Sequence, residues 1–155
     1  MAVKLSGYSP ALRDEIDALN SSLGGRLPNE YIEFLLSYNG AKPATNIFSV
    51  NEGNECGVDE FIPCKTVIKE LPRIDHVSKD MLPIAWAEGG NYILLSLVSG
   101  KIYFWDHEVP EEPTELATGI TEFLDLLKPF DASSVELKEG QVESAWIDPD
   151  FLKNL

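Results

Sequence analysis

Apolar positions between Leu82 and Glu108 fall into three short runs that predict the centre of the fold. The runs are rich in Ile, Leu, Val, Tyr, Phe and Trp, residue types that favour a pleated, buried surface. Two glycine-containing segments, 88–91 and 99–100, separate the runs. Glycine readily adopts the positive φ angles that tight hairpin turns require. The pattern therefore predicts a three-strand antiparallel meander.

The meander is predicted to have two apolar faces, because side chains alternate across a strand. One face should carry Ile93, Leu95, Leu97, Ile102 and Phe104, and the opposite face Tyr92, Leu94, Tyr103 and Trp105. An antiparallel sheet can leave one face uncovered by helices. We expect helices to pack on one face and loops or a partner to meet the other.

Three other segments repeat apolar residues at the three- and four-residue steps of an amphipathic helix. Their predicted buried stripes are Leu12, Ile16, Leu19 and Leu23; Tyr31, Phe34, Leu35 and Tyr38; and Ile120, Phe123, Leu124 and Leu127. Ser9 and Thr118 are the predicted caps of the first and third helices, and Gly40 is the predicted left-handed residue that closes the second. We expect the second stripe to lie on the sheet.

The remaining segments carry weaker patterns. Residues 44–50 and 57–63 have the composition of strands, and residues 66–74 suit a helix that Pro72 should end or bend. Prolines and carboxylates in residues 109–115 predict an exposed acidic loop. Taken together, the patterns predict an α+β fold with a mainly antiparallel sheet, a central three-strand meander and helices packed on one face.

The chain length of 155 residues fits one domain. We expect a single domain over residues 1–155, with its core at about residues 12–128 and an acidic C-terminal extension at residues 131–155. The extension also holds Trp146, Ile147, Phe151 and Leu152, which give it enough apolar surface to dock.

The net charge of −14 arises from 26 acidic against 12 basic residues. Such a field repels phosphate backbones and anionic membranes, so nucleic-acid and membrane binding are disfavoured. A basic partner would be attracted, most strongly to the second half of the chain. No leader pattern or run of about 20 apolar residues is present, and we expect a cytoplasmic protein.

The residue types that most often carry catalysis are poorly placed. His76 lies in a polar connection, and His107 sits between two acids at a strand end, where an ordinary structural role is the simpler reading. Cys56 and Cys64 match no zinc-ligand spacing and are expected to be reduced. We therefore predict no catalytic residues, no metal and no cofactor. The tryptophans Trp86, Trp105 and Trp146 fit either a core or an interface role.

Two motifs in order resemble the SUKH superfamily, the Smi/Knr-like proteins. The matching positions are Leu27-Pro28, Asn39-Gly40, Gly89 to Asn91, Gly100 to Tyr103 and Trp105 to His107, followed by a closing helix at residues 120–127. The resemblance covers roughly residues 12–128.

The resemblance implies an α+β domain without catalytic residues. Bacterial members are mostly immunity proteins that neutralise a secreted polymorphic toxin, often a nuclease, whereas similar fungal domains are regulatory scaffolds in cell-wall assembly. We therefore expect an immunity protein that occludes a basic toxin, with a scaffold as the alternative. Combined with charge, the expected partner-binding residues are Tyr103, Trp105, Asp106, Glu108, Glu111, Glu112 and Glu115. The toxin's identity and the oligomeric state are not predicted.

Overall fold

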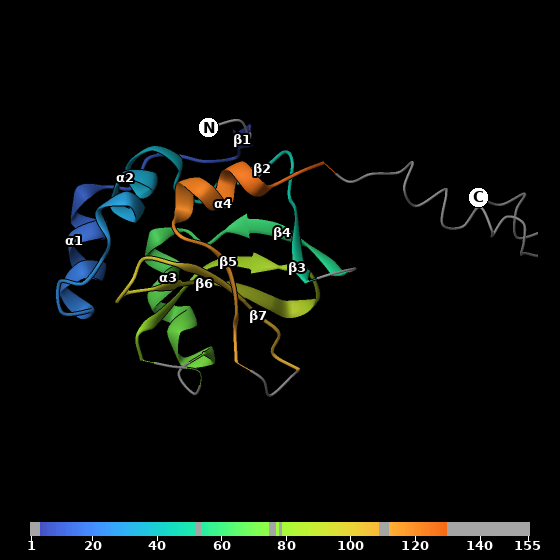
Figure 1. Cartoon of the computed structure of the whole chain (residues 1–155). Coiled ribbons are helices and arrows are strands. Elements are labelled where there is room, and N and C mark those ends of the chain that lie inside the picture. The colour runs from blue at the N-terminus through green and yellow to red at the C-terminus, as the bar shows by residue number, and fades with distance from the viewer. Residues whose placement is uncertain (1–3, 52–53, 75–76, 78, 109–111, 130–155) are drawn as a thin grey trace, which may run out of the picture.

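The structure is a computed structural model, and it describes residues 4–51, 54–74, 77, 79–108 and 112–129. Six antiparallel strands form one sheet in chain order, with the helices around it (Figure 1). The strands are β3 (Ile47–Asn51), β4 (Asn54–Phe61), β5 (Met81–Ala87), β6 (Asn91–Ser96), β7 (Ile102–Trp105) and β8 (Thr114–Ala117). The helices are α1 (Arg13–Ser22), α2 (Asn29–Tyr38), α3 (Cys64–Glu70) and α4 (Ile120–Leu126). The predicted α+β class with an antiparallel sheet is confirmed.

Short elements complete the described fold. Strands β1 (Leu5–Ser6) and β2 (Lys42–Pro43) pair with each other outside the main sheet. The helical turn η1 (Leu71–Arg73) follows α3 directly and contains Pro72. This position confirms that the proline ends the regular α-helix there.

The predicted meander is formed by β5, β6 and β7. The turn η2 (Glu88–Gly90) joins the first two strands, and Gly90 has a φ of 82° there. Cross-strand pairs confirm the two predicted faces, because Ile93 is opposite Phe104 whereas Tyr92 is opposite Trp105.

Helices α2 and α4 pack on the face of the sheet that carries Phe104. The ring centroids of Phe48 and Phe104 lie 5.6 Å apart, those of Phe48 and Phe123 5.9 Å apart, and those of Phe34 and Phe61 4.8 Å apart. Aromatic rings at such separations make favourable tilted contacts in addition to burying apolar area. This aromatic layer joins both helices to the sheet, as the helical stripes predict.

The opposite face is also partly covered by a helix. Glu70, at the end of α3, accepts hydrogen bonds from the side chains of Trp86 and Tyr92. The expectation that only loops or a partner meet this face is therefore wrong over β5 and β6. The apolar pattern of residues 66–74 could not reveal this contact, because it shows which apolar residues are buried and not which partners a charged residue such as Glu70 will meet.

The predicted helix stripes hold in α2, where Tyr31, Phe34 and Leu35 are buried. In α1 the start is shifted. Leu12 is the N-cap residue and is 66% exposed, so the predictions that Leu12 is buried and that Ser9 caps this helix are wrong. The carboxylate of Glu15 instead accepts a hydrogen bond from the Leu12 backbone N–H at 3.0 Å.

Strand β8 corrects the predicted loop at residues 109–115. Thr114 and Glu115 pair with Phe104 and Tyr103 of β7, which gives their backbone a hydrogen-bonding edge that overrides their poor strand composition.

Gly119 is the N-cap residue of α4, so the cap assigned to Thr118 is also wrong. The Thr118 hydroxyl donates to Glu122 instead, at 3.0 Å.

Candidate functional site

The predicted partner-binding residues gather around the end of β7. Tyr103 and Trp105 belong to this strand, Asp106 and Glu108 follow it, and Glu115 lies in the neighbouring strand β8. Glu112 lies just before β8, whereas Glu111 lies outside the described residues. The fold thus brings the described members of the predicted set onto the β7–β8 pair or next to its ends.

A polar turn after β7 positions two of the carboxylates. Asp106 Oδ1 accepts the Glu108 backbone N–H at 2.9 Å. Asn91 Oδ1 lies 2.8 Å from His107 Nδ1 and also accepts the His107 backbone N–H at 3.2 Å. An amide oxygen only accepts, so this contact assigns the proton to Nδ1. The hydrogen bonds hold the turn that displays Asp106 and Glu108.

Gly90 makes the close approach of this turn possible. A Cβ atom at Gly90 would lie 3.2 Å from His107 Cε1, which is a very tight contact. Sequence reasoning treated Gly89 and Gly90 only as hairpin residues and missed the close contact between Gly90 and the imidazole of His107. The sequence did contain a signal for this contact. Gly89-Gly90-Asn91 stands at the start of one predicted strand, and His107 stands at the end of the next, which pairs with it.

The carboxylates of Glu108 and Glu115 differ in how close the nearest basic side chain lies. The Glu108 side chain is 78% exposed, and its Oε2 lies 3.8 Å from His107 Nε2. Glu115 Oε1 is 3.3 Å from Lys101 Nζ. Exposed pairs of this kind add little stability, but their charges still contribute to the field that steers a partner.

Trp105 is a core residue and therefore cannot act as an exposed anchor. It is 6% exposed, and its ring centroid lies 6.0 Å from that of Tyr92. This burial corrects the expected exposed aromatic surface, because only Tyr103 of the two proposed anchors is partly accessible. The alternation pattern placed both rings on one face but could not show what covers Trp105.

Sequence reasoning also missed the Glu70 cluster beside Trp105. Tyr92 Oη donates to Glu70 Oε1 at 2.6 Å, Trp86 Nε1 donates to the same oxygen at 3.1 Å, and Arg73 Nε lies 3.6 Å from Oε2. Burial, and next the hydrogen bond to Glu70, raise the pKa of Tyr92 to about 12. The neutral phenol is thus kept as a donor, which suits a structural tie between α3 and the sheet.

The cysteines lack the setting of a nucleophile. Cys64 is buried, and burial raises the pKa of its thiol to about 11. Burial, followed by the nearby Glu88 carboxylate, also raises the pKa of Cys56. Both environments favour the unreactive thiol.

Among the described residues, His, Cys, Asp and Glu form no cluster able to hold a metal ion. His76 lies outside the described part of the chain.

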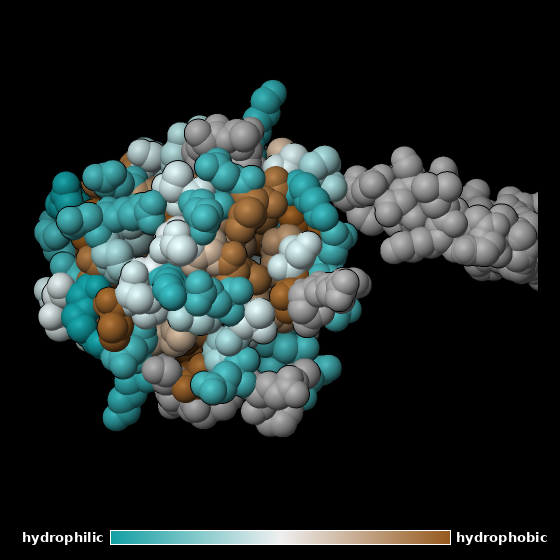
Figure 2. All heavy atoms as spheres, in the orientation of Figure 1, coloured by the Kyte–Doolittle hydropathy of each residue, from teal (hydrophilic) through white to brown (hydrophobic). Residues whose placement is uncertain are grey.

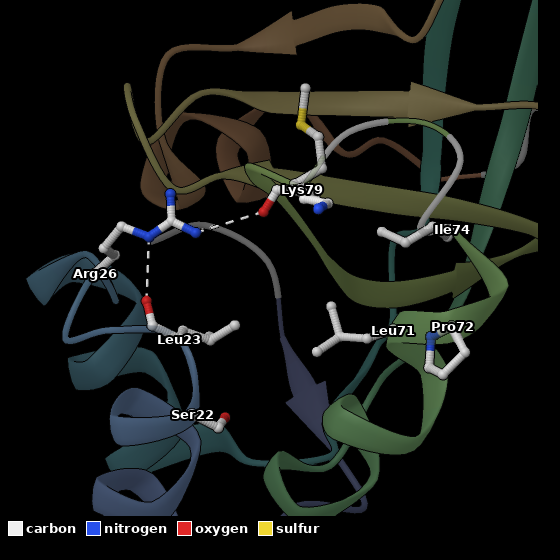
Figure 3. Close-up of a pocket in the computed structure, with 8 residues that line it drawn as sticks. Ser22, Leu23, Arg26, Leu71, Pro72, Ile74 and Lys79 are labelled. Atoms are coloured by element: carbon white, nitrogen blue, oxygen red, sulfur yellow. Dashed lines mark hydrogen bonds between the residues drawn. The ribbon is translucent and has the colours of Figure 1, made fainter.

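Two surface hollows lie away from the β7 turn. The smaller, of about 180 Å³, lies between β3, β8 and α4, where brown apolar atoms surround a depression in Figure 2. The larger, of about 390 Å³, lies between the end of α1 and the η1 turn (Figure 3). Neither hollow is lined by a described member of the predicted partner-binding set.

Comparison with known proteins relates the chain to a protein family and to a bacterial relative. The model of the SMI1/KNR4 family (SUKH-1) matches residues 10–126. The SPbeta prophage-derived uncharacterized protein YokK of Bacillus subtilis (strain 168) is 26% identical over 129 residues, with 67% of each chain covered. The family match spans α1 to α4 and includes the turn that holds His107. Within the described residues, no helix has the length and apolar character needed to span a membrane.

Proposed function

We propose that this chain, which belongs to the SMI1/KNR4 family (SUKH-1), is a non-catalytic immunity protein of the cytoplasm. Its action is to bind a cognate secreted polymorphic toxin and to block the toxin's working surface. The proposed toxin is a basic nuclease. The net charge of −14 supports this choice, since a nuclease must itself attract phosphate and so tends to present a positive surface.

The observation that carries the proposal is the ordered acidic turn after β7. Backbone and side-chain hydrogen bonds hold this turn, yet the Glu108 carboxylate points into solvent. A preformed turn loses little conformational entropy when it binds. The proposed interface comprises Tyr103, Asp106, Glu108, Glu112 and Glu115, with the undescribed Glu111 between them in sequence. Trp105 supports this interface from inside the core.

Two kinds of residue should contribute differently to the complex. The exposed carboxylates should mainly accelerate association, because opposite fields raise encounter rates by roughly 10–10³ at low ionic strength. Tyr103 should mainly slow dissociation, since a partly buried aromatic can become fully desolvated at an interface. Its cross-strand neighbour is Glu115, so both kinds of contact meet on the β7–β8 pair.

The test is to replace Glu108, Glu111, Glu112 and Glu115 together by Gln and to measure binding kinetics with the cognate toxin. The control replaces four exposed acids elsewhere, Asp14, Asp17, Glu33 and Asp125, by the corresponding amides. Both variants change the net charge equally. The proposal expects a larger fall in association rate and a flatter salt dependence for the first variant than for the control.

Equal kinetics for the two variants would place the interface elsewhere. Inhibition must be measured beside binding, because a regulatory scaffold would bind its partner without blocking an activity. Wild-type protein that binds the toxin but leaves its catalysis unchanged would refute the immunity function.

A further inference from the structure

The larger cleft separates the end of α1 from the residues around η1. In Figure 3, Leu23 and Leu71 point toward each other from opposite walls. The apolar lining consists of Leu23, Leu71, Pro72, Ile74 and Met81. The volume of about 390 Å³ lies in the range of pockets that bind small ligands or anchor side chains. The cleft can therefore accept a bulky apolar group.

Among the described residues that line the cleft, the charged ones are basic. They are Arg26 and Lys79, in a chain of net charge −14. Arg26 donates to the Leu23 carbonyl at 3.1 Å, to Asp80 Oδ1 at 2.7 Å and to the Lys79 carbonyl at 3.4 Å. A guanidinium has five N–H donors, so these bonds leave donors for a further carboxylate. The matching ligand combines apolar side chains with carboxylates.

Residues 146–152 have this chemistry. Their sequence is Trp-Ile-Asp-Pro-Asp-Phe-Leu, with two apolar pairs around Asp148 and Asp150. We infer that this segment binds in the cleft of its own chain, with an apolar pair between the walls and an aspartate at Arg26 or Lys79. This intramolecular site is separate from the β7 turn and does not rest on the immunity function.

The chain is long enough for this contact. Seventeen residue steps join Pro129, the last described residue, to Trp146, and they span up to about 56 Å when extended. A core of this size has a radius of gyration of about 14 Å. Such a tether supplies an effective concentration on the order of millimolar, so even modest contacts would keep the cleft occupied.

The smaller hollow beside α4 fits this segment less well. Among the described residues that line it, the charged one is Lys128, whose ammonium pairs with the Glu55 carboxylate. In the cleft Arg26 likewise pairs with Asp80, but Lys79 adds a second basic group. The volume of the smaller hollow, about 180 Å³, is also less than half that of the cleft. Charge and size thus both favour the cleft between α1 and η1.

Competition between the attached segment and a free peptide tests the inference. A fluorescein-labelled peptide of residues 141–155 is titrated with wild-type protein and with the full-length double variant W146A/F151A, whose own segment lacks its anchors. Fluorescence anisotropy should show binding to the double variant and affinity for wild type weaker by roughly tenfold or more. A peptide with Ser in place of Trp146 and Phe151 should bind neither protein.

A charge reversal at the cleft provides the second measurement. In the W146A/F151A background, Lys79→Glu should weaken peptide binding by roughly threefold to tenfold. The matched control, Lys65→Glu, changes an exposed lysine of α3 outside the cleft lining and should have a smaller effect. Circular dichroism confirms that each variant is folded.

Three results would overturn the inference. Equal peptide affinity for wild type and the double variant, or no binding to either, would show that the attached segment does not occupy a shared site. Equal effects of the two lysine substitutions would place the peptide elsewhere. A concentration-dependent mass in sedimentation that W146A/F151A abolishes would assign the segment to a second copy.

Discussion

The Glu30 carboxylate accepts the Ile120 backbone N–H at 2.9 Å, so α2 caps α4 across 90 positions of sequence. The second carboxylate oxygen receives the Thr121 N–H at 3.4 Å. Free amides at a helix start need such acceptors, and a negative charge there also complements the helix dipole. Glu30 thus connects the two helices that cover the Phe104 face.

Replacing Glu30 by Ala should lower the free energy of unfolding by about 1–2 kcal/mol, the usual cost of losing a helix cap. Urea denaturation measures this loss. Glu33→Ala, an exposed position in the same helix, should change stability by less than about 0.5 kcal/mol. Equal effects of the two substitutions would show that the cap contributes nothing specific.

Gly119→Ala should also destabilise the protein, and its cost should depend on Glu30. A Cβ atom at position 119 would lie 2.5 Å from Glu30 Oε1, so the carboxylate would have to move away from the amides it binds. In the Glu30→Ala background that obstacle is absent. A double-mutant cycle should therefore give a coupling of at least about 0.5 kcal/mol, and additive effects would contradict this geometry.

Phe34→Ala should cost about 3–5 kcal/mol through lost burial and a residual cavity. Phe34 is 6% exposed and contacts Phe61 in the aromatic layer between α2 and the sheet. The exposed Ser37 of the same helix provides a control, since Ser37→Ala should have little effect. A loss below about 1 kcal/mol for Phe34→Ala would show that this helix face does not support the core.

Gly90→Ala should destabilise the fold more than Gly100→Ala does. Both glycines have positive φ angles, 82° and 79°, so both substitutions share the backbone strain. Only at Gly90 would the new Cβ press on the His107 ring, because nothing lies within 4 Å at Gly100. Thermal or urea unfolding should reveal the difference, and His107→Ala should reduce it. Equal losses would mean that the imidazole moves aside freely.

Stability should fall above about pH 10, partly because of Tyr92. Its folded pKa is raised to about 12, whereas an unfolded tyrosine ionises near pH 10. The contribution is fully present below the unfolded pKa and is lost as pH rises through the folded value. Between these pH values this residue alone should reduce the free energy of unfolding by up to about 1.4 kcal/mol per pH unit.

Tyr92→Phe removes the titrating group and should make that alkaline decline shallower, even though the variant starts from a lower stability without its hydrogen bond to Glu70. Urea titrations of both proteins at several pH values between 8 and 12 measure the two slopes. Identical slopes would rule out the raised Tyr92 pKa as a cause.

The proposed lack of catalysis is tested by a broad hydrolase and transferase screen. We expect no turnover, since His107 is hydrogen-bonded to Asn91 and both cysteines are held as neutral thiols. Turnover that His107→Ala abolishes while the fold stays intact would refute this expectation.

The sequence by itself determined the meander, the α2 stripe and the glycine turns. These features depend on local periodicity and on backbone freedom, which neighbouring residues largely decide. Ile93 and Phe104 could be assigned to one face because alternation along two adjacent strands joined by a tight turn leaves little choice of register. Because the end of β7 could be located in the same way, the acidic residues that follow it could be assigned to one region of the surface from the sequence.

Only the tertiary structure decided which polar and aromatic groups meet across distant segments. Trp105 is buried beside the Tyr92 ring. Glu70 accepts a hydrogen bond from Tyr92, 22 positions away, and Glu30 replaces the cap expected at Thr118. Strand β8 forms because β7 offers its residues a pairing edge. Each outcome depends on burial and on donors brought together by the folded chain, and such long-range contacts leave no periodic signal in the sequence.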